Sequence, residues 1–534
     1  MGNGDPAQHS SGYRIAHEPM LNPVLAGPHQ GLYRAVVLRP AEPGRGIRPG
    51  DQFCELSLCT RRLKGTPVQT SLRQRSKGLS SNAAESCLSG SGRIWGKDSP
   101  DDLDGLWQAS TIGANRIHPR EASSHGSHGS PVESGCDVGG YRSPVTGRRH
   151  QLVPRMEPYR TSIFAQMSAL ALEVGAVNLG QGFPDTDGPE LLKEEARAAI
   201  DDGRGNQYPP TIGIPALREA IAAHQERFYG LRIDPGSEVG VATGASEAIV
   251  ASIMAFVDVG DEVIVFEPYF DIYDPIIAMA RGVRVAVPLS GEQLRPDIDG
   301  LAAAVTPRTK VLLINSPHNP TGVVLTRTEL EAIAAVAIRH DLIVISDEAY
   351  EHLWFDDHVH IPISSLPGMF ERTVTIGSGG KTFSFTGWKV GWATGPADLV
   401  GAVRTVRQHL SFASSGPFQW AIAMGLGMDD TYFREFRMDL AAKRDLLCSG
   451  LADLGFRVIQ PQGTYFATTD VRPLGFVDGD EFCRVMPHQA GVVAIPHQAL
   501  CARPEVGAPY VRWAFCKRPE VLIEALDRLR AALA

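Results

Sequence analysis

The chain of 534 residues has no uninterrupted run of about 18 apolar residues, the length needed for a transmembrane helix. Its first residues also lack the order of basic and then apolar residues that is typical of a secretory signal. None of its eight cysteines forms a CxxC pair, which argues against a zinc ribbon or a thioredoxin-like site. Scattered single cysteines are typical of a reducing compartment. We therefore expect a cytoplasmic protein that has no membrane partner and binds no metal.

Positive charge is scarce over most of the chain. Residues 1–155 hold 19 Lys or Arg and 13 Asp or Glu, a net charge of +6, so the total of −9 leaves −15 for residues 156–534. An acidic region repels phosphate backbones, and we therefore expect no nucleic-acid partner there. The hydrophobic content of 43% supports a sizeable core, and the length exceeds one ordinary domain.

The first 155 residues lack sustained hydrophobic periodicity. They are rich in Gly, Ser, Pro, Arg and His, as in SSHGSHGS at residues 123–130, and their apolar patch at residues 35–38 is short. Such a composition buries too little apolar surface to offset the entropy of the chain. We expect a low-complexity, disordered extension over residues 1–155. We further expect the physiological chain to start at Met156, which N-terminal sequencing of the native protein would test.

Beyond residue 190 the hydrophobic pattern alternates between helix and strand. Amphipathic stretches predict helices at residues 189–201, 215–229, 329–340, 432–454 and 518–533. Short apolar runs predict strands at residues 263–266, 283–287, 311–314, 342–345 and 373–376. The alternation predicts an α/β protein with a mostly parallel sheet, covered on both faces. We expect an arm at residues 156–195, a large domain at 196–429 and a smaller α+β domain at 430–534.

One lysine stands directly after the last of these strands. The sequence GSGGKTFSFTGWK at residues 377–389 places Lys381 among small residues at the rim of the predicted sheet. A lysine in a Gly/Ser loop is more often solvated than catalytic. An amine held at the rim of a sheet is, however, what an enzyme needs in order to hold pyridoxal phosphate covalently.

Three further motifs follow or precede predicted elements in the same way. They are TGASEA at residues 243–248, NSPHNPTG at 315–322 and SDEAY at 346–350. Each alone is an ordinary helix cap, Pro/Gly turn or acidic helix start. Ligands of open α/β sheets bind outside the carboxyl ends of the strands, where Asn319, Asp347, Ser378 and Lys381 all fall. Together the four motifs predict one cofactor site.

These motifs carry a resemblance to a known family. Six further segments support it: NLGQGFPD at 178–185, NQYPP at 206–210, EPYFD at 267–271, GWKVGW at 387–392, GTYF at 463–466 and VRWAF at 511–515. From about Met156 onward the chain resembles class I/II aminotransferases of fold type I. Within that group it is similar to N-succinyldiaminopimelate aminotransferases and to kynurenine/glutamine aminotransferases. The resemblance implies pyridoxal 5′-phosphate as cofactor and a homodimer as the active unit.

The resemblance also implies a role for each motif residue around the cofactor ring. Lys381 would hold the cofactor and move the proton during catalysis. Asp347 would face the pyridine nitrogen, where a carboxylate favours the protonated ring. Asn319 and Tyr350 would bond to the phenolic oxygen, and Phe270 would stack on the ring.

The cofactor phosphate and the substrate carboxylate would be bound by a second set. The backbone N–H groups of Ala245 and Ser246 at a helix start would bind the phosphate with Ser378 and Lys389. Tyr208 would reach the same phosphate from the other subunit. The resemblance further implies a substrate-carboxylate pocket made by Arg512, Gly182 and Asn315. Phe385 stands where small residues are frequent in this family, and this departure leaves the size of the pocket open.

The leading functional hypothesis is a ping-pong aminotransferase that takes its amino group from glutamate. We expect N-succinyl-2-amino-6-oxopimelate of lysine biosynthesis as the acceptor. The motifs leave open a broad kynurenine, glutamine or methionine aminotransferase, and a cysteine-S-conjugate β-lyase. A transcription regulator that senses pyridoxal phosphate is a distant alternative, since residues 1–155 show no pair of amphipathic helices for a helix-turn-helix.

Overall fold

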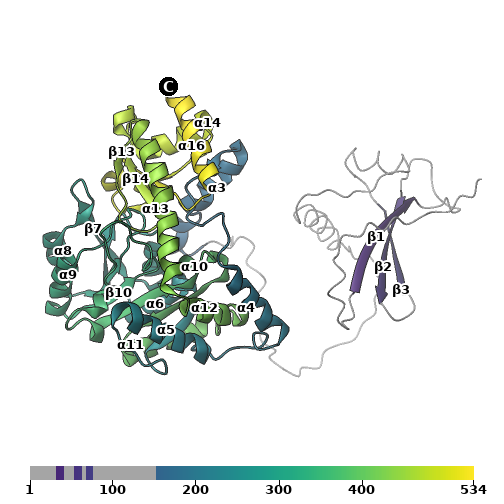
Figure 1. The fold of residues 1–534 in the computed structure, drawn as a ribbon, viewed down its shortest axis with the longest axis horizontal. Coiled ribbons are helices and arrows are strands. Elements are labelled where there is room, and N and C mark those ends of the chain that lie inside the picture. The colour runs from purple at the N-terminus through teal and green to yellow at the C-terminus, as the bar shows by residue number, and fades with distance from the viewer. Residues whose placement is uncertain (1–31, 41–52, 63–67, 76–151) are drawn as a thin grey trace, which may run out of the picture. The chain divides into compact units, whose positions relative to one another are not determined.

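The computed structural model describes residues 32–40, 53–62, 68–75 and 152–534 (Figure 1). Strands β1 (Leu32–Pro40), β2 (Phe53–Arg62) and β3 (Val68–Arg75) form an antiparallel sheet in the order β1-β2-β3. The sequence did not predict these strands within the extension, because its apolar patch at residues 35–38 is brief and polar or basic residues interrupt the rest of the pattern. The disorder expected for the rest of residues 1–151 falls outside the described residues. This sheet and the part from residue 152 onward are separate units, each described by itself.

A sheet of eight strands forms the centre of the larger unit (Figure 1). In spatial order they are β5 (Val239–Thr243), β12 (Val390–Thr394), β11 (Thr373–Ser378), β10 (Ile343–Asp347), β9 (Thr309–Asn315), β6 (Glu262–Glu267), β7 (Val283–Ser290) and β8 (Arg295–Pro296). Strands β6, β7, β9, β10 and β11 pair in parallel, whereas β12 and β8 run antiparallel to their neighbours. The five predicted strands and the mostly parallel sheet are confirmed.

The sheet is covered by helices on both faces because its central strands are apolar on both sides. In β9, Leu312 and Ile314 join a core that contains Ile333 of the helix α9 (Arg327–Arg339). Val311 and Leu313 join the opposite core with the helix α6 (Gly244–Phe256). Alternate residues of a strand point to opposite faces, so one apolar run builds two cores. The remaining helices around this sheet are α4 (Glu190–Asp201), α5 (Pro215–Tyr229), α7 (Tyr273–Ala280), α8 (Ile298–Ala304), α10 (Gly379–Thr382), α11 (Ala397–Leu410) and α12 (Gly416–Leu426).

A smaller domain follows, built on the antiparallel sheet β13 (Arg457–Ile459), β14 (Phe466–Asp470), β17 (Tyr510–Ala514) and β16 (Ile495–Pro496). Its helices are α13 (Asp430–Asp453), α14 (Gly479–Gln489), α15 (Pro504–Gly507) and α16 (Pro519–Leu533). The arm contributes α3 (Ile163–Val174) to the core of this domain. Its strand β4 (Val177–Asn178) pairs in parallel with β15 (Val492–Val493). The expected boundary at residue 195 falls inside α4, whose Leu192 packs in one core with α5 and α12.

Short 3-10 turns complete the larger unit. They are η1 (Pro154–Tyr159), η2 (Ile363–Ser365), η3 (Phe370–Arg372), η4 (Thr386–Trp388), η5 (Arg472–Leu474) and η6 (His497–Leu500). Within the described ranges, no helix combines the length and the apolar character that a membrane crossing requires.

Candidate active site

A cavity of about 260 Å³ lies at the edge where β10 and β11 end. Eleven of the thirteen residues named from the sequence line it: Gly182, Ala245, Ser246, Phe270, Asn319, Asp347, Tyr350, Ser378, Lys381, Lys389 and Arg512. Asp347 and Ser378 are the last residues of β10 and β11. Parallel strands end at a common edge, which explains why motifs far apart in the sequence meet in one cavity.

Lys381 projects into this cavity from α10, the short helix that directly follows β11. Its Nζ donates hydrogen bonds to the Tyr465 hydroxyl at 2.6 Å and to the Gly182 carbonyl at 3.1 Å. Burial, reinforced by the nearby charges of Arg512 and Lys389, lowers the pKa of Lys381 to about 8. An amine with this pKa exists in both protonation states near neutral pH, as a proton-transfer catalyst requires.

Asp347 is a buried carboxyl group without an ion-pair partner among the residues that the structure describes. The Tyr273 hydroxyl donates to its Oδ2 at 2.6 Å, and the Ala349 N–H donates to its Oδ1 at 3.2 Å. Burial raises the pKa of Asp347 to about 6 despite these bonds. A cationic group placed against this carboxyl would restore its charge.

The N-terminus of α6 forms another wall of the cavity. The Thr243 side chain makes no capping hydrogen bond, so the N–H groups of the first turn, around Ala245 and Ser246, can bind an anion. A Cβ atom on Gly244 would lie 3.0 Å from Lys389 Nζ, which places this ammonium beside the helix start. Ser378 adds a hydroxyl on the same side. The arrangement suits a phosphate group.

Arg512 reaches the cavity from β17 of the smaller domain and is only 1% exposed. Its Nη1 donates to Asn319 Oδ1 at 2.9 Å and its Nη2 donates to the Gly180 carbonyl at 2.6 Å. The guanidinium lies 4.0 Å from the centroid of the Phe466 ring. Its Nε is buried without a hydrogen-bond partner, and burial lowers the pKa of Arg512 to about 10. A carboxylate entering the cavity would satisfy this open donor.

Comparison with known proteins decides the family. Residues 174–529 match the family model described as aminotransferase class I and II. The chain belongs to this family.

Two relatives and one solved structure extend this result. A probable N-succinyldiaminopimelate aminotransferase of Mycobacterium tuberculosis is 49% identical over 387 residues, which cover 71% of this chain and 97% of that protein. A methionine aminotransferase of Escherichia coli is 39% identical over 370 residues, 69% of this chain and 95% of that protein. The solved structure of N-succinyldiaminopimelate aminotransferase from Mycobacterium tuberculosis matches with a TM-score of 0.70 and 50% identity. That match covers 72% of this chain and 100% of the other. The predicted family and the fold-type-I architecture are confirmed.

Two residues expected in the aminotransferase site lie outside the cavity. Asn315 is buried behind the wall, where its Nδ2 donates to the Asp347 carbonyl at 2.7 Å and its Oδ1 accepts from the Asn319 N–H at 2.7 Å. These two bonds place Asn315 where it positions Asn319. Tyr208 is 82% exposed, with the edge of its ring against Phe412.

Other aminotransferase-site residues were not identified from the sequence. Phe164, Gln181, Thr386 and Phe466 also line the cavity. Tyr273 and Tyr465, which bond to Asp347 and Lys381, were given no role. A tyrosine in an apolar segment looks like a core residue in the sequence, and only its spatial partner shows otherwise. Phe385 does not line the cavity; it stacks on Trp388 with ring centroids 3.8 Å apart.

Proposed function

We propose that this aminotransferase binds pyridoxal 5′-phosphate. We further propose that it moves the amino group of glutamate to N-succinyl-2-amino-6-oxopimelate in lysine biosynthesis. The arrangement that carries the proposal is the buried, partly unsatisfied guanidinium of Arg512 in one cavity with the Lys381 amine. The choice of substrate rests on the 49% identity with the probable N-succinyldiaminopimelate aminotransferase of Mycobacterium tuberculosis.

The residues present fit the cofactor at three points. Among the described residues, none forms an ion pair with the buried carboxyl of Asp347, which leaves it able to bind a protonated pyridine nitrogen. The first turn of α6 and the Lys389 ammonium offer a phosphate site. Phe270 lines the wall between them, where its ring can cover the aromatic cofactor. When bound, pyridoxal phosphate supplies the electron sink that makes the α-proton of an amino acid removable.

Lys381 then serves as the proton carrier. With a pKa of about 8, its Nζ is unprotonated in a usable fraction of molecules near neutral pH. The free amine can take the proton from the substrate α-carbon and return it one position along the reacting system. The Tyr465 hydroxyl and the Gly182 carbonyl hold Nζ on one side of the cavity. Proton removal and return therefore occur on the same face.

Arg512 fixes the substrate for this transfer. A bidentate guanidinium binds the α-carboxylate in one orientation, and the bond from Asn319 Oδ1 holds the guanidinium in place. The described cavity holds one such guanidinium, so donor and acceptor acids must use it in turn. This sharing is the physical basis of the ping-pong mechanism that we propose.

We propose a homodimer as the active unit, with Tyr208 acting on the phosphate of its partner subunit. The exposed position of Tyr208 outside its own cavity is consistent with that role. Light scattering should give a mass of two chains. Tyr208→Phe should weaken cofactor affinity while dimer mass is kept; a fully active monomer would contradict the proposal.

A half-reaction screen tests the substrate. The absorbance of the bound cofactor would be followed while glutamate, N-succinyl-diaminopimelate, kynurenine, glutamine and methionine are offered one at a time. Rapid conversion by glutamate and N-succinyl-diaminopimelate alone would support the proposal. Comparable conversion by the other amino acids would make the enzyme a broad-specificity aminotransferase. Conversion by none would favour the β-lyase or the regulator, and Lys381→Ala serves as the unreactive control.

A further inference from the structure

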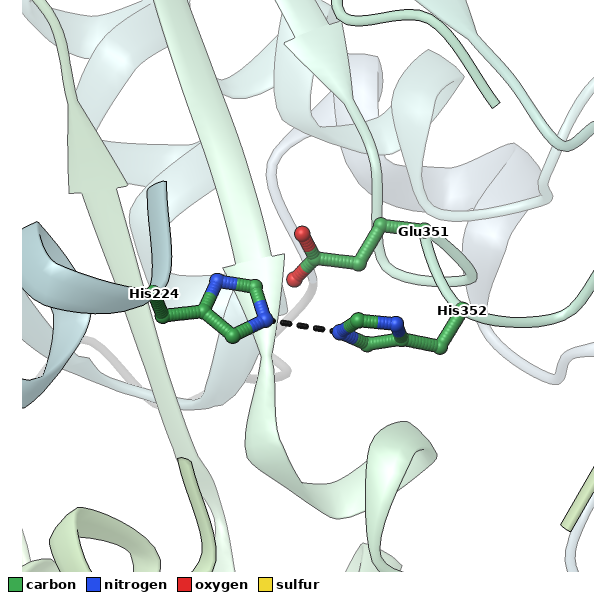
Figure 2. Close-up of side chains that lie close together, drawn as sticks. All are labelled: His224, Glu351 and His352. Atoms are coloured by element: carbon green, nitrogen blue, oxygen red, sulfur yellow. Dashed lines mark hydrogen bonds between the residues drawn. The ribbon is translucent and has the colours of Figure 1, made fainter. Parts of the chain in front are cut away.

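Three side chains that commonly bind metals meet outside the active-site cavity (Figure 2). His224 projects from α5, whereas Glu351 and His352 lie in the turn after β10, just beyond Tyr350. One nitrogen of each imidazole and one carboxylate oxygen all lie within 4.8 Å of one another. All three residues are at least 97% buried. Two segments of the chain thus bring three donor atoms to one point.

The Glu351 carboxyl group has no cationic partner among the described residues. Glu351 accepts a hydrogen bond from the Tyr229 hydroxyl at 2.8 Å, but among the described residues no Lys or Arg forms an ion pair with it. Metal binding would displace any proton from this carboxyl group, because an ion binds the carboxylate form. Neutral imidazoles and a carboxylate are the forms that bind metal ions.

We propose that His224, Glu351 and His352 bind one zinc ion, with water as the fourth ligand. Two imidazole nitrogens and one carboxylate are an established ligand set for zinc with one open position. His352 also lines a neighbouring cavity of about 230 Å³, together with Tyr229, His360, Arg434 and Arg437, so water can reach one of the three ligands. The Tyr229 hydroxyl orients the carboxylate, as partners of metal ligands commonly do.

The ligands need only a small rearrangement. The two Nε2 atoms lie 2.7 Å apart and share a hydrogen bond, in which one ring donates to the other. Zinc–nitrogen bonds at a tetrahedral angle place two nitrogens about 3.3 Å apart, so the rings must separate by roughly 0.6 Å. The donated proton moves to Nδ1 of its own ring, and no proton leaves the pair. His224 Nδ1 has no hydrogen-bond partner, so no contact fixes the tautomer of this ring.

Such an ion would tie α5 to the turn that follows the site residues Asp347 and Tyr350. The site is independent of the proposed substrate, because none of its three residues lines the active-site cavity. The sequence indicated no metal, since His224 and His352 are 128 residues apart and form no closely spaced motif.

Metal analysis of the full-length protein tests the proposal. The protein would first be freed of metal with a chelator and then dialysed against a low, buffered zinc concentration. Bound zinc would be measured by mass spectrometry of the metal, and stability by thermal unfolding. We expect about one zinc ion per chain and a higher unfolding temperature with zinc. Glu351→Gln keeps the size of the side chain and should lose both effects. His340→Gln removes an exposed imidazole at the end of α9 and should keep both.

Two results would overturn the proposal. The first is less than roughly 0.1 zinc ion per wild-type chain after dialysis, which would leave the cluster as a histidine hydrogen bond only. The second is zinc binding by Glu351→Gln equal to that of the wild type, which would mark the ion as adventitious. Should Glu351→Gln fail to fold, His352→Gln provides the same comparison. Retained zinc in that variant would likewise contradict the assignment.

Discussion

Burial shifts the pKa values of Lys381 and Asp347 in opposite directions. It lowers the pKa of Lys381 to about 8 and raises that of Asp347 to about 6. Both shifts have one cause, because a low-dielectric surrounding disfavours the charged form of either group. The cavity thus brings the base and the carboxyl closer to neutral before any cofactor or substrate enters.

Replacement of Lys381 by alanine tests the role of the amine. Lys381→Ala should lose covalent attachment of the cofactor and at least a thousandfold of the turnover rate, because no other amine lies at the same point. The measurement combines initial rates with the absorbance of the bound cofactor. Lys389→Ala is the matched control and should lower cofactor affinity while turnover at saturating cofactor is kept. A near wild-type rate in Lys381→Ala would reject the mechanism.

In the cofactor-free protein, the charge of Asp347 should lower the free energy of unfolding at high pH. The folded-state pKa of about 6 lies above the ordinary value near 3.8, so the protonated form stabilises the fold. That contribution is fully present at low pH and is lost as the pH rises through about 6. Asp347→Asn should therefore raise the free energy of unfolding at pH 8 by roughly 3 kcal/mol, and by about half as much at pH 5. Urea unfolding at both pH values measures the difference; an equal effect at both would contradict it.

At the scale of secondary-structure elements, residues at the end of β10 face both the active-site cavity and a buried polar cluster on the opposite side. Asp347 and Tyr350 line the active-site cavity. Glu348 turns away, accepts a hydrogen bond from Ser346 Oγ at 2.7 Å and lies 2.9 Å from His360 Nε2. Buried polar contacts of Glu348 thereby fix this short turn, whose residues Asp347 and Tyr350 face the cavity. Such fixation keeps catalytic side chains in place.

The arm that carries Gly182 must pass close to β14. A Cβ atom at this position would lie 2.5 Å from Phe466 Cζ, and Phe466 supports the Arg512 guanidinium. Gly182→Ala should therefore displace the ring and lower kcat/KM by about tenfold or more. The global fold should survive, as judged by circular dichroism.

A control glycine stands at the end of α3. Gly175 has a φ of +64°, and no atom lies within 4 Å of an added Cβ. Gly175→Ala should cost about 1 kcal/mol of stability through backbone strain and leave kcat/KM unchanged. Equal kinetic losses in both variants would show that the close contact at Phe466 has no special role.

Across the larger unit, the active site is built by two domains. Lys381 and Asp347 stand on the large sheet, and Arg512 stands on β17 of the smaller domain. The bond from Arg512 to Asn319 joins the two at the cavity. Packing between the domains therefore aligns the Lys381 amine, our proposed proton carrier, with the Arg512 guanidinium, our proposed carboxylate-binding group.

Every residue that lines the active-site cavity lies after Met156. A chain that begins at Met156 should therefore keep wild-type kcat and KM and a similar unfolding temperature. Steady-state kinetics of the shortened and full-length chains make the comparison. A loss of more than about tenfold in kcat/KM would show that the first 155 residues contribute to the active site.

Prediction from the sequence stopped where small residues or distant partners decided the structure. Strands β5 and β12 have the sequences VGVAT and VGWAT, and their small residues weaken the apolar signal. Asn315 does not line the cavity, because its motif fixes its position in the chain but not the direction of its side chain. Tyr273 and Tyr465 bond to Asp347 and Lys381, which lie 74 and 84 positions away in the chain.

The sequence by itself determined the central strands, the order of the motifs and the family, because hydrophobic period and turn chemistry are local properties. Only the tertiary structure decided which groups are buried together. The contact between Asn319 and Arg512 spans 193 residues, and the pair of His224 and His352 spans 128. Charge states depend on the same packing, since burial sets the pKa of Lys381 and Asp347. Distance and dielectric arise only when remote segments meet, and no local pattern encodes them.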